Sequence, residues 1–328
     1  WSFAATLRCS RSRAPDAGLA FHRSKRFLWP CARKSASQPS RWALEWEGTS
    51  SLLNEIYQSL DPIAFSVGPF SVRWYGIAYV LGFICAALVL MSTAKRWRVR
   101  VDSDALITIM LCVVVGVIVG GRLGYVLFYG DGYYLQHPAD IFALSKGGMS
   151  FHGGLVGALL SGVVAAHFTH IPYLTLADLG CIGAPIGLFF GRCANFVNGE
   201  LWGAPTDAAW GVVFGGQAGM MPRHPSQLYE AVLEGIVIFL VLFALSRKRP
   251  PRAQGTFLGV FLIMYGCFRF VIEFVREPDV QLGYLWGGWL TMGQVLSTPL
   301  IAIGIGVLLY ALIAKKSQQG LPELKQSE

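Results

Sequence analysis

The stretch YLTLADLGCIGAPIGLFFGRCANFVNGELWG, residues 173–203, begins as a continuous apolar segment and ends in a polar turn. An α-helix needs about 20 mainly apolar residues to cross a hydrocarbon layer of about 30 Å, and residues 173–196 meet that requirement. Four polar side chains stand at its end: Arg192, Asn195, Asn198 and Glu200. Polar groups are costly in lipid and therefore mark candidate functional sites. The stretch predicts a membrane-spanning helix that carries a functional site at one end.

The composition of the whole chain supports the same fold class. Of its 328 residues, 54% are hydrophobic and 14% are charged, whereas soluble proteins carry about 25% charged residues. Seven apolar stretches are long enough to span a membrane, at approximately residues 72–92, 105–129, 151–169, 173–196, 228–246, 256–275 and 289–314. We predict an all-α fold, a polytopic membrane helix bundle of about seven transmembrane helices. Residues 197–227, rich in Gly, Pro and Trp, are predicted to form a small extracytoplasmic lid between the fourth and fifth spans.

Basic residues in the short connections predict the orientation of the bundle, because Lys and Arg are enriched on the cytoplasmic side of membrane proteins. They cluster after the first, fifth and seventh spans, at Lys95, Arg96, Arg98, Arg100, Arg247, Lys248, Arg249, Arg252, Lys315 and Lys316. We therefore expect these connections to be cytoplasmic. The predicted domains are a seven-helix transmembrane catalytic domain over residues 59–316 and a cytoplasmic tail over residues 317–328.

Residues 1–58 form a basic N-terminal extension in this prediction. Its first 44 residues hold nine Lys or Arg and a single acidic residue, Asp16, and account for the net charge of +8. Three interpretations are open: a disordered tail, a non-native extension upstream of the true start, or an organellar transit peptide, which has a similar Arg- and Ser-rich composition. We favour the first two and leave the extension out of the fold prediction.

On the predicted topology, the intramembrane polar side chains converge at the outer boundary. The group comprises Arg73, Tyr75, Arg122, His152, Arg192, Asn195, Gln227, Tyr229, Glu230, Glu234, Tyr265, Arg269 and Glu273. Asp178 lies at the opposite end of its span, where we expect a structural role at a helix terminus. Two simpler interpretations stay open. Arg73 and Arg223 can be interfacial anchors, and Arg269 with Glu273, four residues apart, can be a structural ion pair.

Glycines recur every four residues below this polar layer. They are Gly153 and Gly157 in the third span, and Gly183, Gly187 and Gly191 in the fourth. Small residues at this spacing let helix backbones approach closely in a membrane. We expect the two ladders to bring the third and fourth spans into contact.

Several arginines at the outer boundary of a bilayer suit an anionic phospholipid head group. Arginine grips phosphate oxygens with a planar fork of donors, and a neighbouring His or Tyr can serve as a general base. Glu200, Glu230 and Glu273 can orient the arginines or accept protons. The seven cysteines include no CxxC pair and no Cys/His cluster at zinc spacing, so no metal site is predicted. These residues do not identify the nucleophile.

Six motifs resemble those of the prolipoprotein diacylglyceryl transferase family, in the same order along the chain. They are WYG at 74–76, GGRLGYVLFY at 120–129, GGMSFHGGLVG at 147–157, GRCANFVNGELWG at 191–203, RHPSQLYE at 223–230 and YGCFRFVIEFVREPD at 265–279. The resemblance covers about residues 60–314 and departs from the family pattern at Cys193-Ala194. It implies a bacterial inner-membrane enzyme that moves the diacylglyceryl group of phosphatidylglycerol onto the lipobox cysteine thiol of a preprolipoprotein, releasing glycerol 1-phosphate.

The resemblance also implies roles for individual residues. The implied catalytic residues are His152, Tyr265, Arg192 and Arg269, with His152 or Tyr265 accepting the thiol proton. The implied phosphatidylglycerol-binding residues are Arg192, Asn195, Arg269, Tyr75, Asn198, Glu200, Glu273 and Arg122. The implied partners are phosphatidylglycerol, preprolipoprotein signal peptides with a lipobox cysteine, and membrane lipids. No cofactor, metal or nucleic acid is implied, and the active site is expected near the periplasmic side.

Two rival classes of function fit the sequence less well. A transporter or channel for an anionic solute typically has midplane polar sites and often internal repeats, whereas no repeat occurs in this sequence and its charges gather at one boundary. Another lipid-phosphate enzyme often has an acidic metal-binding cluster such as paired aspartates, and the sequence contains none.

Overall fold

A computed structural model describes residues 51–68, 70–130, 132–143, 147–249, 251–277, 284–286 and 289–320, apart from the side chains at positions 129, 151, 152, 284 and 286. All of these residues belong to one compact unit, Thr49–Glu328. The predictions for residues 1–50 and for the tail beyond residue 320 fall outside the described residues.

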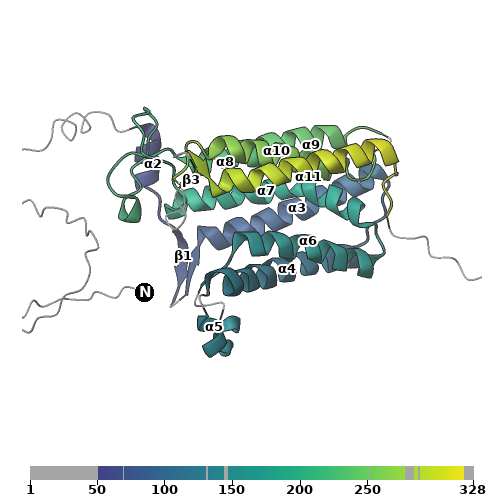
Figure 1. Ribbon diagram of the computed structural model, residues 1–328, viewed down its shortest axis with the longest axis horizontal. Coiled ribbons are helices and arrows are strands. Elements are labelled where there is room, and N and C mark those ends of the chain that lie inside the picture. Colours follow the sequence, from purple (N-terminus) through teal and green to yellow (C-terminus); the bar gives the residue numbers. More distant parts are fainter. Residues whose placement is uncertain are drawn as a thin grey trace, which may run out of the picture. The chain divides into compact units, whose positions relative to one another are not determined.

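Seven apolar helical segments make up the described bundle, at the positions that the apolar stretches predict (Figure 1). They are α3 (Trp74–Trp97), α4 (Ser103–Tyr129), α6 (Phe151–Thr169), α7 (Tyr173–Asn198), the run of α8 (Ser226–Glu230), η4 (Ala231–Val237) and α9 (Ile238–Ser246), then α10 (Thr256–Ile272) and α11 (Met292–Ala314). Of the described segments, five are long and apolar enough to cross a membrane, and α6 and α10 contain shorter apolar helices. The predicted polytopic helical membrane protein is confirmed.

Two small antiparallel hairpins depart from the predicted all-α fold. They are β1 (Ile63–Val67) with β2 (Phe70–Arg73), and β3 (Tyr284–Trp286) with β4 (Leu290–Thr291). Each ends where a spanning helix begins, so a hydropathy profile merges their apolar residues with the following span. Four short helical elements complete the described chain: α2 (Leu52–Gln58), α5 (Tyr133–Gln136), η1 (Pro138–Phe142) and η3 (Gly216–Ala218).

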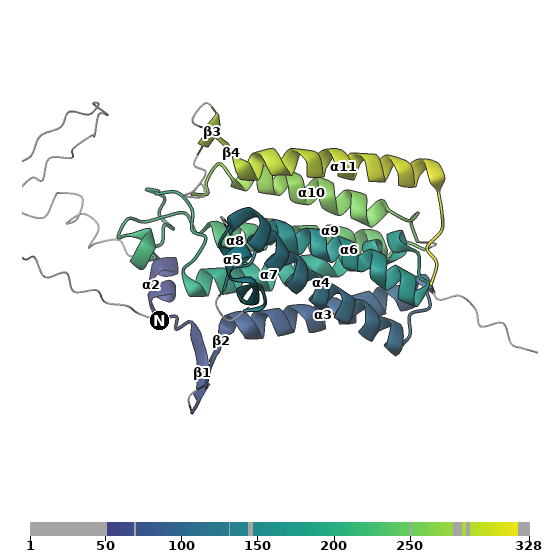
Figure 2. The same ribbon diagram turned by 60° about the horizontal axis from the view of Figure 1, so that its bottom comes forward.

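The spanning segments pack closely as the pairs α3 with α7, α4 with α6, and α10 with α11 (Figures 1 and 2). Glycines make these approaches possible. A Cβ atom on Gly157 would overlap the carbonyl group of Gly116 in α4, and one on Gly183 would lie 3.1 Å from the Ala86 carbonyl oxygen in α3. The helices α6 and α7 do contact each other, but the two glycine ladders do not mediate that contact as predicted. Each ladder packs against a different helix that offers its own small residues.

Asp178 joins the first turns of α7 to the start of α10. Its Oδ2 accepts a hydrogen bond from the Gly255 amide at 2.8 Å, and its Oδ1 accepts one from the Leu258 amide at 2.9 Å. These amides belong to the start of α10, whose N-cap residue is a glycine without a capping side chain. A carboxylate there satisfies free amides and interacts favourably with the helix dipole. The structural role predicted for Asp178 at a helix terminus is confirmed.

Residues 199–225, called the lid below, connect α7 to α8 around a small apolar cluster. The buried residues of this cluster are Phe196, Val212, Phe214 and Ala218. Helix α2 packs against it through Tyr57, and the Gln58 side-chain amide donates to the Val213 carbonyl oxygen at 2.7 Å. Residues 51–58, predicted to belong to the N-terminal extension, are thus part of the folded domain.

Candidate active site

The end of α7 gathers three polar side chains into one hydrogen-bonded group. The helix stops where Gly199 adopts a φ of 66°, a left-handed conformation that glycine takes without strain. The turn places the Glu200 carboxylate beside the last turn of α7. There its Oε1 accepts hydrogen bonds from Asn195 Nδ2 at 3.0 Å and Asn198 Nδ2 at 3.2 Å. The Gln227 side-chain amide donates to the Glu200 carbonyl oxygen at 2.7 Å. This bond ties the turn to α8.

Glu230 of α8 is fully buried and contacts three arginines. Arg192 Nε lies 2.7 Å from its Oε2, an ion pair without hydrogen-bond alignment. Arg269 Nη1 and Arg276 Nη1 lie 2.7 Å and 2.8 Å from its Oε1. Arg192 Nη2 also lies 3.3 Å from Oε2 of Glu234, which is equally buried. The Glu230 carboxylate is therefore the common partner of arginines from α7, from α10 and from the turn that follows α10.

Glu273 continues this network toward α11. Its Oε1 lies 3.0 Å from Arg269 Nη2 and 3.7 Å from Arg276 Nε. Its Oε2 accepts a hydrogen bond from the hydroxyl of Thr291, the N-cap residue of α11, at 3.3 Å. Gly293 follows on α11, and a Cβ atom there would overlap the Glu273 carboxylate. The predicted pair of Arg269 and Glu273 is therefore present as part of a larger network.

These ion pairs define an ionic cluster of three arginines and three glutamates, with balanced formal charge: Arg192, Arg269, Arg276, Glu230, Glu234 and Glu273. The side chains of Arg192 and Arg269 are 13% and 17% exposed, whereas those of Glu230 and Glu234 are 0% exposed. The glutamates thus lie behind two arginines and hold their guanidinium groups in place. Buried charges require such pairing, because an isolated one would lose several kcal/mol of solvation.

Two of the predicted tyrosines lie beside the ionic cluster. Tyr265 is buried one helical turn before Arg269 and interacts electrostatically with Glu234 and Arg192. Tyr75, at the start of α3, interacts with Arg192 and Glu200, and its hydroxyl lies 3.2 Å from the Tyr79 hydroxyl. The fold therefore brings together most of the predicted site: Tyr75, Arg192, Asn195, Asn198, Glu200, Tyr265, Arg269 and Glu273.

Arg122 is bound to a different part of the chain. Its guanidinium group donates to the carbonyl oxygens of Ile141 at 2.8 Å and Gly148 at 2.9 Å, and to those of Asp140 and Gly147. The side chain is only 4% exposed, and these contacts hold the connection that leads into α6. Lipid binding by Arg122 stays a prediction, and the observed contacts are to the main chain.

His152 is the second residue of α6, and its side chain lies outside the described residues. The helix start itself is well defined. The Ser150 hydroxyl accepts a hydrogen bond from the Gly153 amide at 3.2 Å, and the Ser150 amide donates to the Gly121 carbonyl oxygen of α4 at 2.8 Å. The backbone at the position predicted to supply a base is thus anchored to α4.

Arg223 connects two segments of the lid to each other and to the chain that follows α10. Its Nη1 lies 2.8 Å from Glu277 Oε2 and donates to the Gly203 carbonyl oxygen at 3.2 Å, while its Nε donates to the Ala218 carbonyl oxygen at 2.9 Å. These contacts give Arg223 a structural role within the lid, and its interpretation as an interfacial anchor stays a prediction. Next to it, burial lowers the pKa of His224, which favours the neutral imidazole at pH 7.

Two members of the ionic cluster, Glu234 and Arg276, have no site role predicted from the sequence. Glu234 is predicted only as one of the outer polar residues, and Arg276 occurs only within the motif at 265–279. A spacing signal existed for Arg276, which lies three residues after Glu273 and seven after Arg269, on one face of a continuing helix. Glu234 lies four residues after Glu230, within the π-helical segment η4, and such segments are frequent at functional sites.

The arrangement favours recognition of a phosphate group. Arg192 and Arg269 present the partly exposed side of a cluster whose acidic side is buried, so an anion meets fixed guanidinium donors. Arginine forks of this kind bind phosphate oxygens bidentately. Donors held rigidly in a site from which water is excluded also stabilise charge that develops during a reaction.

Comparisons with known proteins agree with this chemistry. Residues 62–310 match the family model described as prolipoprotein diacylglyceryl transferase. Proteins named phosphatidylglycerol–prolipoprotein diacylglyceryl transferase are similar over most of their length. That of Methylocella silvestris is 49% identical over 260 residues, which cover 78% of this chain and 95% of the relative. That of Geobacter sulfurreducens is 48% identical over 249 residues, covering 76% and 94%, and that of Methylococcus capsulatus is 48% identical over 267 residues, covering 80% and 98%.

Proposed function

The chain belongs to the prolipoprotein diacylglyceryl transferase family, and on this premise we propose that it transfers the diacylglyceryl group of phosphatidylglycerol to a cysteine thiol of a prolipoprotein. It is then a transferase of lipoprotein biosynthesis, as the names of its relatives state for them. The observation that carries the proposal is the family match, which spans every helix of the ionic cluster. The lipobox cysteine of the signal peptide is the proposed acceptor.

In the proposed reaction, the cysteine sulfur bonds to the carbon of the diacylglyceryl group that carries the phosphate ester. The carbon–oxygen bond to the phosphate breaks, and glycerol 1-phosphate leaves with the bonding electrons. Arg192 and Arg269 bind the phosphate and offset the charge that grows on the leaving oxygen. Asn195, Asn198, Glu200 and Tyr75 complete the lipid-binding surface, and Glu273 orients Arg269 through their 3.0 Å contact. Arg122 shapes the site by holding the connection into α6.

A thiol with a pKa near 8.5 must lose its proton to become a strong nucleophile. The proposed acceptor of that proton is His152 or Tyr265. Tyr265 is supported by its place beside Arg192, and His152 by the motif in which it lies. The nucleophile belongs to the protein substrate, so the reaction requires none of this chain's own cysteines.

We also propose that the chain spans the bacterial inner membrane with the active site near the periplasmic side. The basis is the distribution of basic residues, since the connections after α3 and α9 carry clusters of Lys and Arg. Arg192 lies at the opposite end of the bundle from these connections, because α3 and α7 run in opposite directions. The ionic cluster then faces the compartment in which the substrate cysteine is presented.

The test is a transfer assay with the purified full chain, phosphatidylglycerol in mixed micelles and a lipobox peptide, read by the mass of the peptide. We expect a mass gain of one diacylglyceryl group. Arg192→Lys keeps the positive charge but loses the fork, and should slow transfer by about 10²–10³-fold. Arg100→Lys, in the basic connection after α3, is the matched control and should leave the rate unchanged.

Two results would contradict these proposals separately. If the wild-type chain produces no mass gain, the proposed reaction is wrong. If Arg192→Lys transfers at the wild-type rate while the reaction proceeds, the assignment of the site is wrong. Thermal unfolding in detergent checks that the variant is folded.

A further inference from the structure

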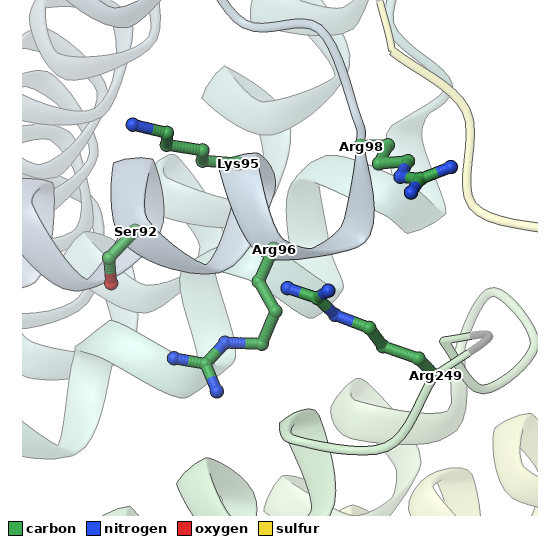
Figure 3. A pocket seen from close by; sticks show the side chains of 5 residues that line it. All are labelled: Ser92, Lys95, Arg96, Arg98 and Arg249. Carbon is green, nitrogen blue, oxygen red and sulfur yellow. The ribbon is translucent and has the colours of Figure 1, made fainter.

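A second arginine-rich site lies at the far end of the bundle from the ionic cluster. A wide-open surface cavity of about 390 Å³ is lined by Ser92, Lys95, Arg96, Arg98 and Arg249 (Figure 3). The first four belong to the last turns of α3 and its C-cap, and Arg249 belongs to the connection after α9. Helix α3 rises by about 30 Å between Tyr75, beside the ionic cluster, and this cavity. The two sites are therefore separate.

Buried contacts hold the two basic segments together. The Trp97 side chain is 5% exposed, donates through Nε1 to the Ser246 carbonyl oxygen at 2.9 Å, and packs against Phe257 with ring centroids 4.9 Å apart. The guanidinium group of Arg96 lies over the Phe243 ring, 6.0 Å from its centroid. Such cation–π contacts orient an arginine. The end of α3 is thus clamped to the end of α9, and the basic side chains are positioned by this scaffold.

Among the described residues, the cations of this cavity have no acidic partner. In the ionic cluster every arginine contacts a glutamate, but no ion pair within 4.0 Å joins the four cations of this cavity to any acidic side chain of the described residues. In Figure 3 the guanidinium groups of Arg96 and Arg249 extend into the same space beside α3. Like charges repel, and an anion that bridges two guanidinium groups removes this repulsion with charge-assisted hydrogen bonds.

We propose that this cavity binds the phosphate group of an anionic phospholipid, as a binding site distinct from the transfer reaction. Arg96 and Arg249 contact the phosphate oxygens, and Lys95 and Arg98 add electrostatic attraction. A lipid fits better than a free anion because Leu88, one helical turn before Ser92, is 65% exposed on the apolar surface of α3. An acyl chain can lie against that surface while the head group enters the cavity. Basic pockets between transmembrane helices on the cytoplasmic side are known to bind lipid head groups.

Native mass spectrometry of the purified full chain tests this proposal. The probes are dioleoyl phosphatidic acid, dioleoyl phosphatidylcholine and inorganic phosphate. The double variant Arg96→Gln with Arg249→Gln removes the two phosphate contacts. The double variant Lys315→Gln with Lys316→Gln removes the same charge from the same end of the bundle but not from the cavity. Unfolding temperature and transfer rate of both double variants verify that each is folded, since neither pair lies in the ionic cluster.

We expect the wild-type chain to retain one more phosphatidic acid than the Arg96/Arg249 variant, whose affinity at this site should fall about tenfold to thirtyfold. The Lys315/Lys316 variant should bind as the wild type does, and phosphatidylcholine should not compete. Equal binding by the wild type and the Arg96/Arg249 variant would overturn the proposal. An equal loss in both double variants would do so too, because diffuse charge would then explain the binding. Full competition by millimolar inorganic phosphate would overturn the assignment to a lipid.

Discussion

At the residue scale, Glu230 forms ion pairs with more arginines than any other carboxylate of the described residues. One buried carboxylate contacts three guanidinium groups, and Glu234 and Glu273 balance the remaining charge. Transferring ions from water into a protein interior costs several kcal/mol for each ion, so a buried pair survives only when its partners are complete. Removing a single carboxylate leaves an uncompensated positive charge at the meeting point of three helical segments.

Glu230→Gln should therefore destabilise the protein by about 3–5 kcal/mol. The glutamine keeps the shape of the side chain but not its charge, so Arg192, Arg269 and Arg276 lose their common partner. Thermal or denaturant unfolding of the purified protein in detergent measures the effect.

A matched control for Glu230→Gln is Glu277→Gln, which removes the charge of an exposed glutamate. Its side chain is 41% exposed and lies 2.8 Å from Arg223, and exposed ion pairs contribute at most about 1 kcal/mol. If both substitutions lower the stability equally, the burial of Glu230 does not decide its importance.

At the scale of elements, the helix pairs depend on faces made of small residues. Gly157 on α6 meets Gly116 and Gly120 on α4 so closely that a Cβ atom on Gly157 would overlap the carbonyl group of Gly116. Close backbone approach of this kind is a main source of helix association in lipid, where no hydrophobic driving force acts between helices. The pairing of α4 with α6 also positions the start of α6, and with it the backbone of His152.

Gly157→Ala should separate α4 from α6 and destabilise the protein by about 1–3 kcal/mol, the usual range for overpacking. Gly180→Ala on α7 is the control, because a Cβ atom there meets no atom within 4 Å. It should be neutral or should stabilise the helix by up to about 1 kcal/mol through helix propensity. Unfolding in detergent compares the two variants. Equal tolerance of both would show that the α4–α6 contact does not require glycine.

At the scale of the whole molecule, the lid and α2 form a unit above the ionic cluster. Deleting residues 1–48 should preserve transfer activity and stability, because the described contacts of the lid begin with Ser51, whose hydroxyl donates to the Gly211 carbonyl oxygen at 3.1 Å. Deleting residues 1–58 removes α2 as well and should lower both. The transfer assay and thermal unfolding measure the pair of deletions. If the two deletions behave alike, α2 does not support the lid.

The proposed orientation predicts which ends of the bundle are accessible in cells. Asp207→Cys in the lid should react with a membrane-impermeant maleimide in intact spheroplasts, whereas Lys248→Cys should react only after lysis. Both positions are exposed, and the wild-type chain reports the background from its own cysteines. Labelling of Lys248→Cys in intact spheroplasts would contradict the orientation.

The positions of the membrane-spanning segments were predictable from local sequence alone. In lipid, every backbone amide and carbonyl must be satisfied within the segment, so an apolar stretch of sufficient length becomes a helix whatever its neighbours are. A structural role for Asp178 was predictable from its place at the opposite end of its span from the other polar residues, but the helix that it caps, α10, was not. The two hairpins were not predictable from hydropathy, since strand residues such as Val72 are as apolar as the helix that follows.

The sequence by itself determined the spans, the polar ends of α7 and α10, and the motifs that indicate the family. Only the tertiary structure decided which helices pair, since several glycine faces were available and their fit depends on the partner surface. It also decided that Arg192 and Arg269 are backed by buried glutamates, whereas Arg122 binds loop carbonyls. These outcomes depend on distances between residues far apart in the chain, such as Arg192 and Glu230. The energy of an ion pair decreases with the separation of its charges, and the order of the helices alone does not determine that separation.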